Sequence, residues 1–263
     1  MDGIGAAWAA YNVYGLNAEY LPSYHDQARP DVTGRDVLIL DFSYKRHIIT
    51  EMANAAKSLL VIDHHESAQK DLAGIPFCTF DMNRSGAGMA WDILNPGKPR
   101  PWHIEYIEDR DLWRHKLDNT YEISAWLHFQ EVRTVQEYEE RIATTKLSFD
   151  NIINHGSVIL DVRNEYVSDT MEQIQETSLD GIGPVPGINA AFFCKSELLG
   201  KMCVGRKFAL LWCVQKDGRF CYSLRSDENG MNVVDIAVKF GGGGHKRSAG
   251  FTSDTRVDIP MTR

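Results

Sequence analysis

Two continuous apolar runs, each ended abruptly by acid, constrain this chain most. Residues 37–40 (VLIL) are followed by Asp41, and residues 59–62 (LLVI) are followed by Asp63-His64-His65. Unbroken apolar runs of this length are typical of strands buried on both faces of a parallel sheet. The Ala-rich segment 47–58 between them is predicted to be helical, which gives a β-α-β unit. The sequence therefore predicts an α/β fold with a parallel sheet in its N-terminal domain.

Charge and cysteine content exclude several classes of protein. The 263 residues carry 28 Lys and Arg against 36 Asp and Glu, a formal net charge of −8. Such a surface lacks the positive field with which proteins bind long duplex DNA. The five cysteines include no C-x-x-C pair, which favours structural thiols in a reducing cytoplasm over a disulfide framework. No apolar run approaches the roughly 18 residues of a membrane span, so we expect a cytoplasmic protein with no membrane partner.

The remainder of the chain falls into a helical connector and a second domain. Residues 4–14 read as a first helix, and the proline-free stretch 128–178 shows helical periodicity. Glycines and prolines from 181 to 187 read as a loop, followed by predicted strands at 190–194, 208–214 and 219–225. We therefore predict a catalytic domain at 1–127, a helical connector at 128–178 and a smaller mixed α/β domain at 179–263, with a cleft between the two domains.

The acid and imidazole side chains at the strand ends suggest a metal site. In open parallel sheets, ligands bind beyond the carboxyl ends of the strands, where Asp41 and His64 both fall. Asp and His are suitable ligands for Mn²⁺ or Mg²⁺. In the alternative interpretation, Asp41 caps a helix, and His64 and His65 satisfy backbone groups in a turn. The combination with Asp63-His64-His65 favours the metal site.

Three features of the sequence resemble those of a known family. The apolar strand ending in VIDHH, Asp41 after an earlier strand, and GGGGHKRSAGF near the C-terminus resemble the DHH phosphoesterases. The resemblance is to the two-domain type with a DHH-associated C-terminal domain, which includes RecJ-like nucleases, nano-RNA and dinucleotide phosphodiesterases. It implies a site for two metal ions.

The resemblance also implies roles for individual residues. Asp2, Asp41, His64 and Asp109 would bind metal, with Asp111 as the alternative to Asp109. Asp41 would bridge the two ions and Asp63 would orient His64. His65 would face the scissile phosphate. Asp41, Asp63 and His65 are therefore the predicted catalytic residues.

The chain departs from the family pattern at its start. It begins Met1-Asp2-Gly3, so the His and first Asp of the family's opening motif are missing, together with the strand that carries them. Three explanations are an upstream true start, a variant working with one tightly bound ion, and a protein that binds its ligand without efficient turnover. We favour the first, and expect the missing segment to raise Mn²⁺-dependent hydrolysis.

Substrate binding is predicted for residues in both domains. A run of glycines removes every Cβ, so backbone N–H groups can approach an anion, although such a run is ordinarily a flexible loop. An Arg at a strand end and a His after the run add donors for phosphate. A polar loop entering the helix at 89–94 offers a helix N-terminus to an anion, or is ordinary capping. The predicted substrate-binding residues are Arg84, Ser85, Arg225, Gly242, Gly243, Gly244 and His245.

These features together predict a metal-dependent phosphodiesterase. The expected substrates are short oligonucleotides or dinucleotides, because no long basic groove is evident. The alternatives are hydrolysis of polyphosphate or another small phosphate compound, and a catalytically impaired nucleotide-binding protein. A homodimer is compatible with the sequence.

Overall fold

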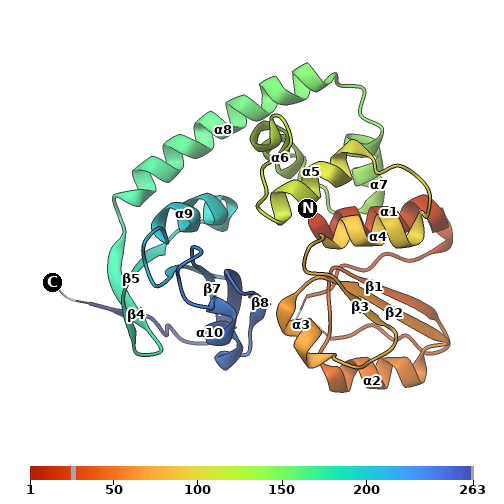
Figure 1. The fold of residues 1–263 in the computed structure, drawn as a ribbon, viewed down its shortest axis with the longest axis horizontal. Helices are drawn as coiled ribbons and strands as arrows, with labels where there is room; N and C mark the ends of the chain where they lie inside the picture. Colours follow the sequence, from red (N-terminus) through yellow and green to blue (C-terminus); the bar gives the residue numbers. More distant parts are fainter. Residues whose placement is uncertain (25–27, 262–263) are drawn as a thin grey trace. The chain divides into compact units, whose positions relative to one another are not determined.

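The computed structural model describes residues 1–24 and 28–261 (Figure 1). The chain divides into two compact units, Met1–Leu160 and Asp161–Arg263, each with its own sheet and cores. This confirms the α/β class predicted from the sequence. Among the described helices, none combines the length and the apolar character needed to cross a membrane.

The first unit is built on a parallel sheet of three strands in the order β1-β2-β3. The strands are β1 (Asp36–Leu40), β2 (Ser58–Asp63) and β3 (Cys78–Phe80), and α2 (Arg46–Ala55) joins the first two. Their pairing places Leu40 beside Ile62. The carboxyl ends of β1 and β2 therefore lie at the same edge of the sheet.

Helices cover both faces of this sheet (Figure 1). Ile49 and Met52 of α2, with Leu72 directly after α3 (Glu66–Asp71), form a core with Ile39 and Val61. On the other side, α1 (Asp2–Tyr14) packs beside α4 (Gly86–Leu94). The remaining helical segments of this unit are η1 (Gly15–Asn17), α5 (Trp102–Asp111), α6 (Thr120–Phe129), α7 (Val135–Tyr138), the π-helical turn η2 (Glu139–Ala143) and the first half of α8 (Phe149–Met171).

Aromatic side chains hold this helical layer together. Trp8 of α1 stacks on Trp91 of α4 with ring centroids 5.4 Å apart and an interplanar angle of 5°. Trp8 also donates from its indole nitrogen to Glu139. His103 is buried against Trp8 and hydrogen-bonds Tyr138, and burial lowers its pKa to about 3. The imidazole is therefore neutral and acts in packing.

The second unit contains a mixed sheet in the order β10-β4-β5-β6-β7-β9-β8. Of its adjacent pairs, β5–β6 is parallel and the others are antiparallel. The strands are β4 (Gln175–Leu179), β5 (Ile182–Asn189), β6 (Ala209–Val214), β7 (Phe220–Arg225), β8 (Gly243–His245), β9 (Ser248–Ser253) and β10 (Ile259–Pro260). One face packs against α10 (Val233–Lys239), and the other against α9 (Lys195–Met202) and the end of α8.

The structure differs from the predicted elements between residues 175 and 194. The strand β4 begins within the stretch 128–178 that was predicted to be a helical connector. Residues 190–194 were expected to be a strand, but they form a loop and the 3₁₀ turn η3 (Phe192–Cys194) that leads into α9. The strand lies earlier, in the glycine- and proline-rich stretch predicted as a loop. Pro184 and Pro186 are accommodated because β5 pairs with β6 only over residues 187–189. Before Gly187 that side of β5 is an unpaired edge, where proline's missing N–H costs no ladder bond.

Candidate metal centre

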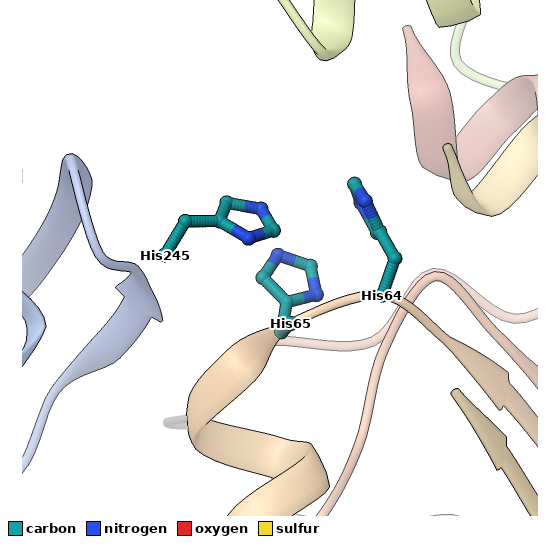
Figure 2. A group of neighbouring side chains, drawn as sticks. All are labelled: His64, His65 and His245. Carbon is teal, nitrogen blue, oxygen red and sulfur yellow. The ribbon is translucent and has the colours of Figure 1, made fainter. Parts of the chain in front are cut away.

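Side chains from separate elements meet beyond the carboxyl ends of β1 and β2. Asp41 follows β1 with a left-handed backbone (φ 53°), and His64 follows β2. The Nε2 atom of His64 lies 3.2 Å from Asp41 Oδ1 and 3.3 Å from Asp2 Oδ2. Figure 2 shows His64 and His65 projecting from the segment between β2 and α3. The structure thus brings together three of the four residues predicted to bind metal.

Asp2 is held by the N-terminus of α4. Its two carboxylate oxygens accept hydrogen bonds of 2.7 Å from the backbone N–H groups of Gly86 and Ala87. The positive end of the helix therefore faces a carboxylate of the chain itself. Burial disfavours this charge, but the hydrogen bonds from His64 and the two amides outweigh burial and lower the pKa of Asp2.

Gly86 permits the close approach of α4 to Asp41. A methyl group added at Gly86 would lie 2.4 Å from Asp41 Cβ and 2.6 Å from its carboxyl carbon. Atoms cannot approach this closely, so any larger residue would push the helix and the carboxylate apart. The glycine was predicted only as part of a polar loop.

Asp63 and His65 form a second group that shares Asp41. Asp63 Oδ1 lies 2.6 Å from His65 Nδ1 and accepts hydrogen bonds from the backbone N–H groups of His64 and His65. Its other oxygen accepts a 2.6 Å bond from the Ser43 hydroxyl. Donor atoms of Asp41, Asp63 and His65 all lie within 4.8 Å of one another, as do those of Asp2, Asp41 and His64.

At the end of α5, it is Asp111 that faces His64. Asp111 Oδ2 is 3.6 Å from His64 Nε2. The Asp109 carboxylate instead accepts hydrogen bonds from the backbone N–H groups of Lys116 and Leu117 at 2.9 to 3.3 Å. Two residues along an α-helix correspond to a rotation of about 200°, so the two carboxylates point to opposite sides. The structure therefore places the alternative, Asp111, in the position expected for Asp109.

Negative charge is crowded in this cluster. Burial and the charge of Asp2 raise the pKa of Asp41 to about 7 and that of Asp111 to about 6. Burial opposes protonation of His64, but the Asp2 and Asp41 carboxylates 3.2 to 3.3 Å from its Nε2 atom raise its pKa to about 11. Three carboxylates around one imidazole leave an excess of negative charge that a divalent cation would neutralise.

The donor set fits a hard or borderline divalent ion. Carboxylate oxygens and one imidazole nitrogen suit Mn²⁺ or Mg²⁺, and no thiol is among them. Asp41 Oδ1 is buried and accepts no hydrogen bond of regular geometry from the described residues, although it faces His64. A buried carboxylate oxygen in this state is one that a cation would satisfy.

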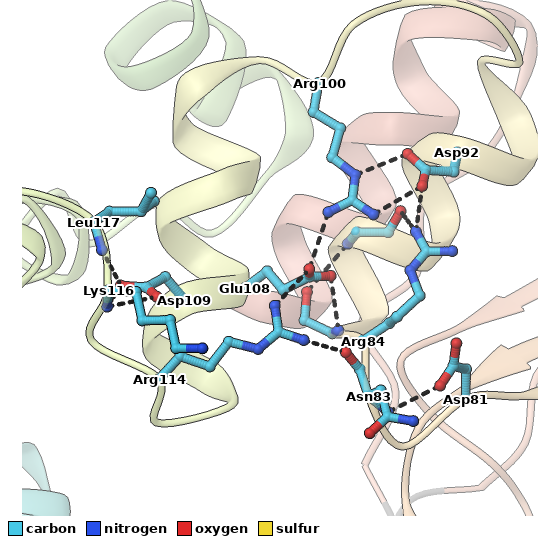
Figure 3. A network of polar contacts seen from close by, with 12 residues as sticks. Asp81, Asn83, Arg84, Asp92, Arg100, Glu108, Asp109, Arg114, Lys116 and Leu117 are labelled. Carbon is cyan, nitrogen blue, oxygen red and sulfur yellow. Dashed lines mark hydrogen bonds and ion pairs between the residues drawn. The ribbon is translucent and has the colours of Figure 1, made fainter.

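A polar network supports the loop before α4 (Figure 3). The buried Glu108 accepts hydrogen bonds from Ser85 N, Arg100 and Arg114, at 3.0 to 3.1 Å. Gly88 gives this carboxylate room, since an added Cβ would lie 2.1 Å from Glu108 Oε2. Sequence reasoning missed Glu108, and the acid-rich segment around it carries no signal that separates it from its neighbours.

Arg84 and Ser85, predicted to bind substrate, are engaged in this same region. Arg84 donates to Gly88 O at 2.7 Å and pairs with Asp92. Ser85 is fully buried, and its hydroxyl caps α4 by accepting from Gly88 N at 3.1 Å. Their role toward a substrate stays a prediction.

The other predicted substrate-binding residues lie in the second unit, where their role also stays a prediction. Arg225 ends β7, and Gly243, Gly244 and His245 form β8. The glycines have a packing function there. A Cβ atom added at Gly242 would lie 2.1 Å from the backbone oxygen of Gly250, and a Cβ atom added at Gly244 would lie 2.6 Å from the backbone oxygen of Ser248. The glycine run thus lets β8 and its lead-in approach β9 closely.

Comparison with known proteins finds similarity but no matching family. No protein-family model matches the chain. An uncharacterised protein of Acanthamoeba polyphaga mimivirus is 30% identical over 279 aligned residues, which cover 95% of this chain. The chain spans 64% of that viral protein's length.

Three solved structures resemble the chain at low sequence identity. The pGpG-specific phosphodiesterase PggH of Vibrio cholerae has a TM-score of 0.48 and 14% identity, and the match covers 96% of this chain and 90% of PggH. The exonuclease RecJ bound to manganese has a TM-score of 0.42 and 13% identity, and the match covers 82% of this chain and 70% of RecJ. An exopolyphosphatase-related protein of Bacteroides fragilis has a TM-score of 0.41 and 13% identity, and the match covers 81% of this chain and 65% of that protein.

Proposed function

We propose that this chain is a divalent-metal-dependent phosphoesterase that hydrolyses short oligonucleotides or dinucleotides. One observation supports the proposal above the others. Asp2, Asp41 and Asp111, from separate parts of the fold, each place a carboxylate oxygen 3.2 to 3.6 Å from the Nε2 atom of His64. Ordinary packing gives no reason to gather three carboxylates around one buried imidazole.

Asp2, Asp41, His64 and Asp111 would hold the ion, and Asp41 would also be available to a second position beside Asp63. When bound, a divalent cation lowers the pKa of a water molecule and offsets charge that develops on phosphoryl oxygens. The α4 N-terminus keeps Asp2 ionised and in place through two backbone hydrogen bonds. Ser43 and three further donors fix Asp63 in the same way.

His65 is suited to contact a phosphate. Burial acts against its charged form, but the hydrogen bond and charge of Asp63 raise the pKa of His65 above the ordinary value. With Asp63 at Nδ1, the imidazolium has its Nε2–H directed away from that carboxylate. About one third of the side chain is exposed. It can therefore donate a hydrogen bond to a phosphoryl oxygen and later release a proton to a leaving oxygen.

The proposed substrate size follows from charge. A net charge of −8 disfavours the many phosphate contacts that long nucleic acids require. A short ligand needs only the local cation and a few donors. This argues for substrates of a few nucleotides.

The test is hydrolysis of 5′-phosphorylated dinucleotides and of inorganic tripolyphosphate by the full chain with Mn²⁺. Asp41→Asn and His64→Ala are expected to reduce kcat/KM at least about 100-fold and to abolish Mn²⁺ binding measured by calorimetry. Glu105→Gln, an exposed acid on α5, is the matched control and should change neither value. Unaltered Mn²⁺ binding in both site variants would contradict the proposed ligands. Hydrolysis confined to tripolyphosphate would contradict the proposed substrate class.

A further inference from the structure

A cluster of planar side chains, tilted against one another, begins at the end of α5. The guanidinium carbon of Arg110 lies 4.1 Å from the centre of the Trp113 ring. The ring of His115 is 4.7 Å from that of Trp113 and 4.5 Å from that of Tyr121. Trp113 and Tyr121 nevertheless keep 39% and 53% of their surface exposed. Two partly exposed aromatic rings so close together offer a flat apolar surface suited to contact with a planar ligand.

Arg110 and His115 lie on the same side of the indole. Groups on opposite faces of an aromatic ring are separated by two van der Waals contacts, roughly 7 Å. Arg110 Nη1 and His115 Nε2 are only 3.5 Å apart. Arg110 and His115 therefore support the Trp113 ring from one side, and 39% of the residue's surface is exposed.

The loop that carries Trp113 is held in a costly backbone conformation. Trp113 and His115 have left-handed φ values of 55° and 49°, which bulky residues rarely adopt. The backbone and carboxylate oxygens of Asp109 accept hydrogen bonds from the N–H groups of Arg114, Lys116 and Leu117. This is the role that the structure gives Asp109, a residue predicted to bind metal. Strain maintained in this way is common beside binding sites.

Trp113 also lies next to the candidate metal centre. It follows Asp111 by two residues, so their Cα atoms are at most about 7.6 Å apart. Asp111 reaches the His64 imidazole from the end of α5. When the phosphate of a nucleotide lies at the candidate metal centre, the base of the same nucleotide would therefore be able to reach the Trp113 indole.

We propose that Trp113, backed by Arg110 and His115, is a stacking surface for a nucleobase of the substrate. The inference rests on the proposed phosphoesterase function and refines its substrate class. Stacking on an aromatic ring requires a planar base and tolerates any base sequence. It would make the protein select nucleotides over phosphate compounds without a base, which share the same metal chemistry.

The experiment compares two ligands that differ only in their bases. They are 5′-phosphorylated diadenylate and its abasic analogue, in which hydrogen replaces both adenines. Affinity for the full chain is measured by calorimetry in EDTA, where metal-dependent turnover is stopped, and kcat/KM is measured for both with Mn²⁺. The variants are Trp113→Ala, Trp113→Phe and the control Phe129→Ala, which removes a 66% exposed ring at the end of α6.

Trp113→Ala should weaken diadenylate binding about tenfold and leave the abasic analogue unaffected. Trp113→Phe should retain most of the affinity because it keeps a ring, and Phe129→Ala should match the wild type. Equal losses on both ligands, or no loss on either, would overturn the inference. Base-dependent binding without hydrolysis of either ligand would refute the proposed function and leave the stacking surface standing.

Discussion

Asp41 is the residue on which the candidate centre depends most. It belongs both to the group with Asp2 and His64 and to the group with Asp63 and His65. Its left-handed backbone turns the chain directly after β1, a conformation that Asp tolerates better than most residues. A single side chain therefore connects two sets of donors.

The space around Asp41 gives a graded prediction. Gly86→Ala would place a methyl group 2.4 Å from Asp41 Cβ, whereas Gly3→Ala would place one 3.3 Å from Asp41 Oδ2. The first clash involves an atom fixed to the backbone, so we expect a loss of about 1–3 kcal/mol in unfolding free energy and at least tenfold weaker Mn²⁺ binding. The second should be mild. Chemical denaturation and calorimetry of both variants check this order, and equal effects would contradict it.

At the scale of elements, the sequence predicts what depends on local pattern. The apolar runs before Asp41 and Asp63 located β1 and β2, and their parallel pairing brought Asp41 and His64 to one edge. The choice between Asp109 and Asp111 depended on the rotation of α5 about its axis, which tertiary packing determines. Because the two residues are only two positions apart on the same helix, the sequence could not show which one faces His64.

The strand β5 shows a second limit. Its glycines and prolines are typical of a loop, but Pro184 and Pro186 are acceptable in a strand because β5 pairs only with β4 before Gly187. Gly187 is required there because an added Cβ would lie 2.4 Å from Thr177 Cγ2. Such requirements come from neighbouring strands distant in sequence, so local propensity cannot reveal them.

The side chain of Asp258 connects β7 to the end of the second unit, and its contribution to the stability of the fold is expected to depend on pH. The buried Asp258 accepts hydrogen bonds from Tyr222 and Arg256 at 2.7 to 3.0 Å. Burial disfavours its charge, but these bonds outweigh burial and lower the pKa of Asp258 below its ordinary value of 3.8. A carboxylate with a depressed pKa stabilises the fold above that ordinary value, and the contribution is lost as pH falls through the folded-state pKa.

Asp258→Asn should therefore cost about 1.5–3 kcal/mol of unfolding free energy near pH 7, the value of hydrogen bonds to a charged group. The difference from wild type should shrink as the pH is lowered from about 5 toward 3. Urea denaturation across this range measures it, with the exposed Asp254→Asn as control. A difference that stays constant with pH would refute the assignment.

At the scale of the whole molecule, the candidate metal centre concentrates charge that affects the stability of the fold. Without a cation, the crowding of Asp2, Asp41 and Asp111 opposes folding. A ligand that binds only the folded chain adds about 2.7 kcal/mol at 100 times its Kd. We expect saturating Mn²⁺ to raise the Tm by several degrees and EDTA to reverse this, as followed by circular dichroism.

Asp41→Asn provides the decisive comparison. It removes one crowded charge, so the metal-free variant should melt at or above the wild-type temperature, while its response to Mn²⁺ should disappear. Glu105→Gln should respond like the wild type. A full Mn²⁺ response in Asp41→Asn would show that the cation stabilises the chain elsewhere.

The hydrogen bonds from Gly86 and Ala87 to Asp2 connect the first turn of α4 to the candidate metal centre. Local opening of that turn would release Asp2, so the two events share one equilibrium. A bound cation should consequently slow the exchange of these two amide protons with solvent. Fraying of the helix end would, in return, speed the ion's escape.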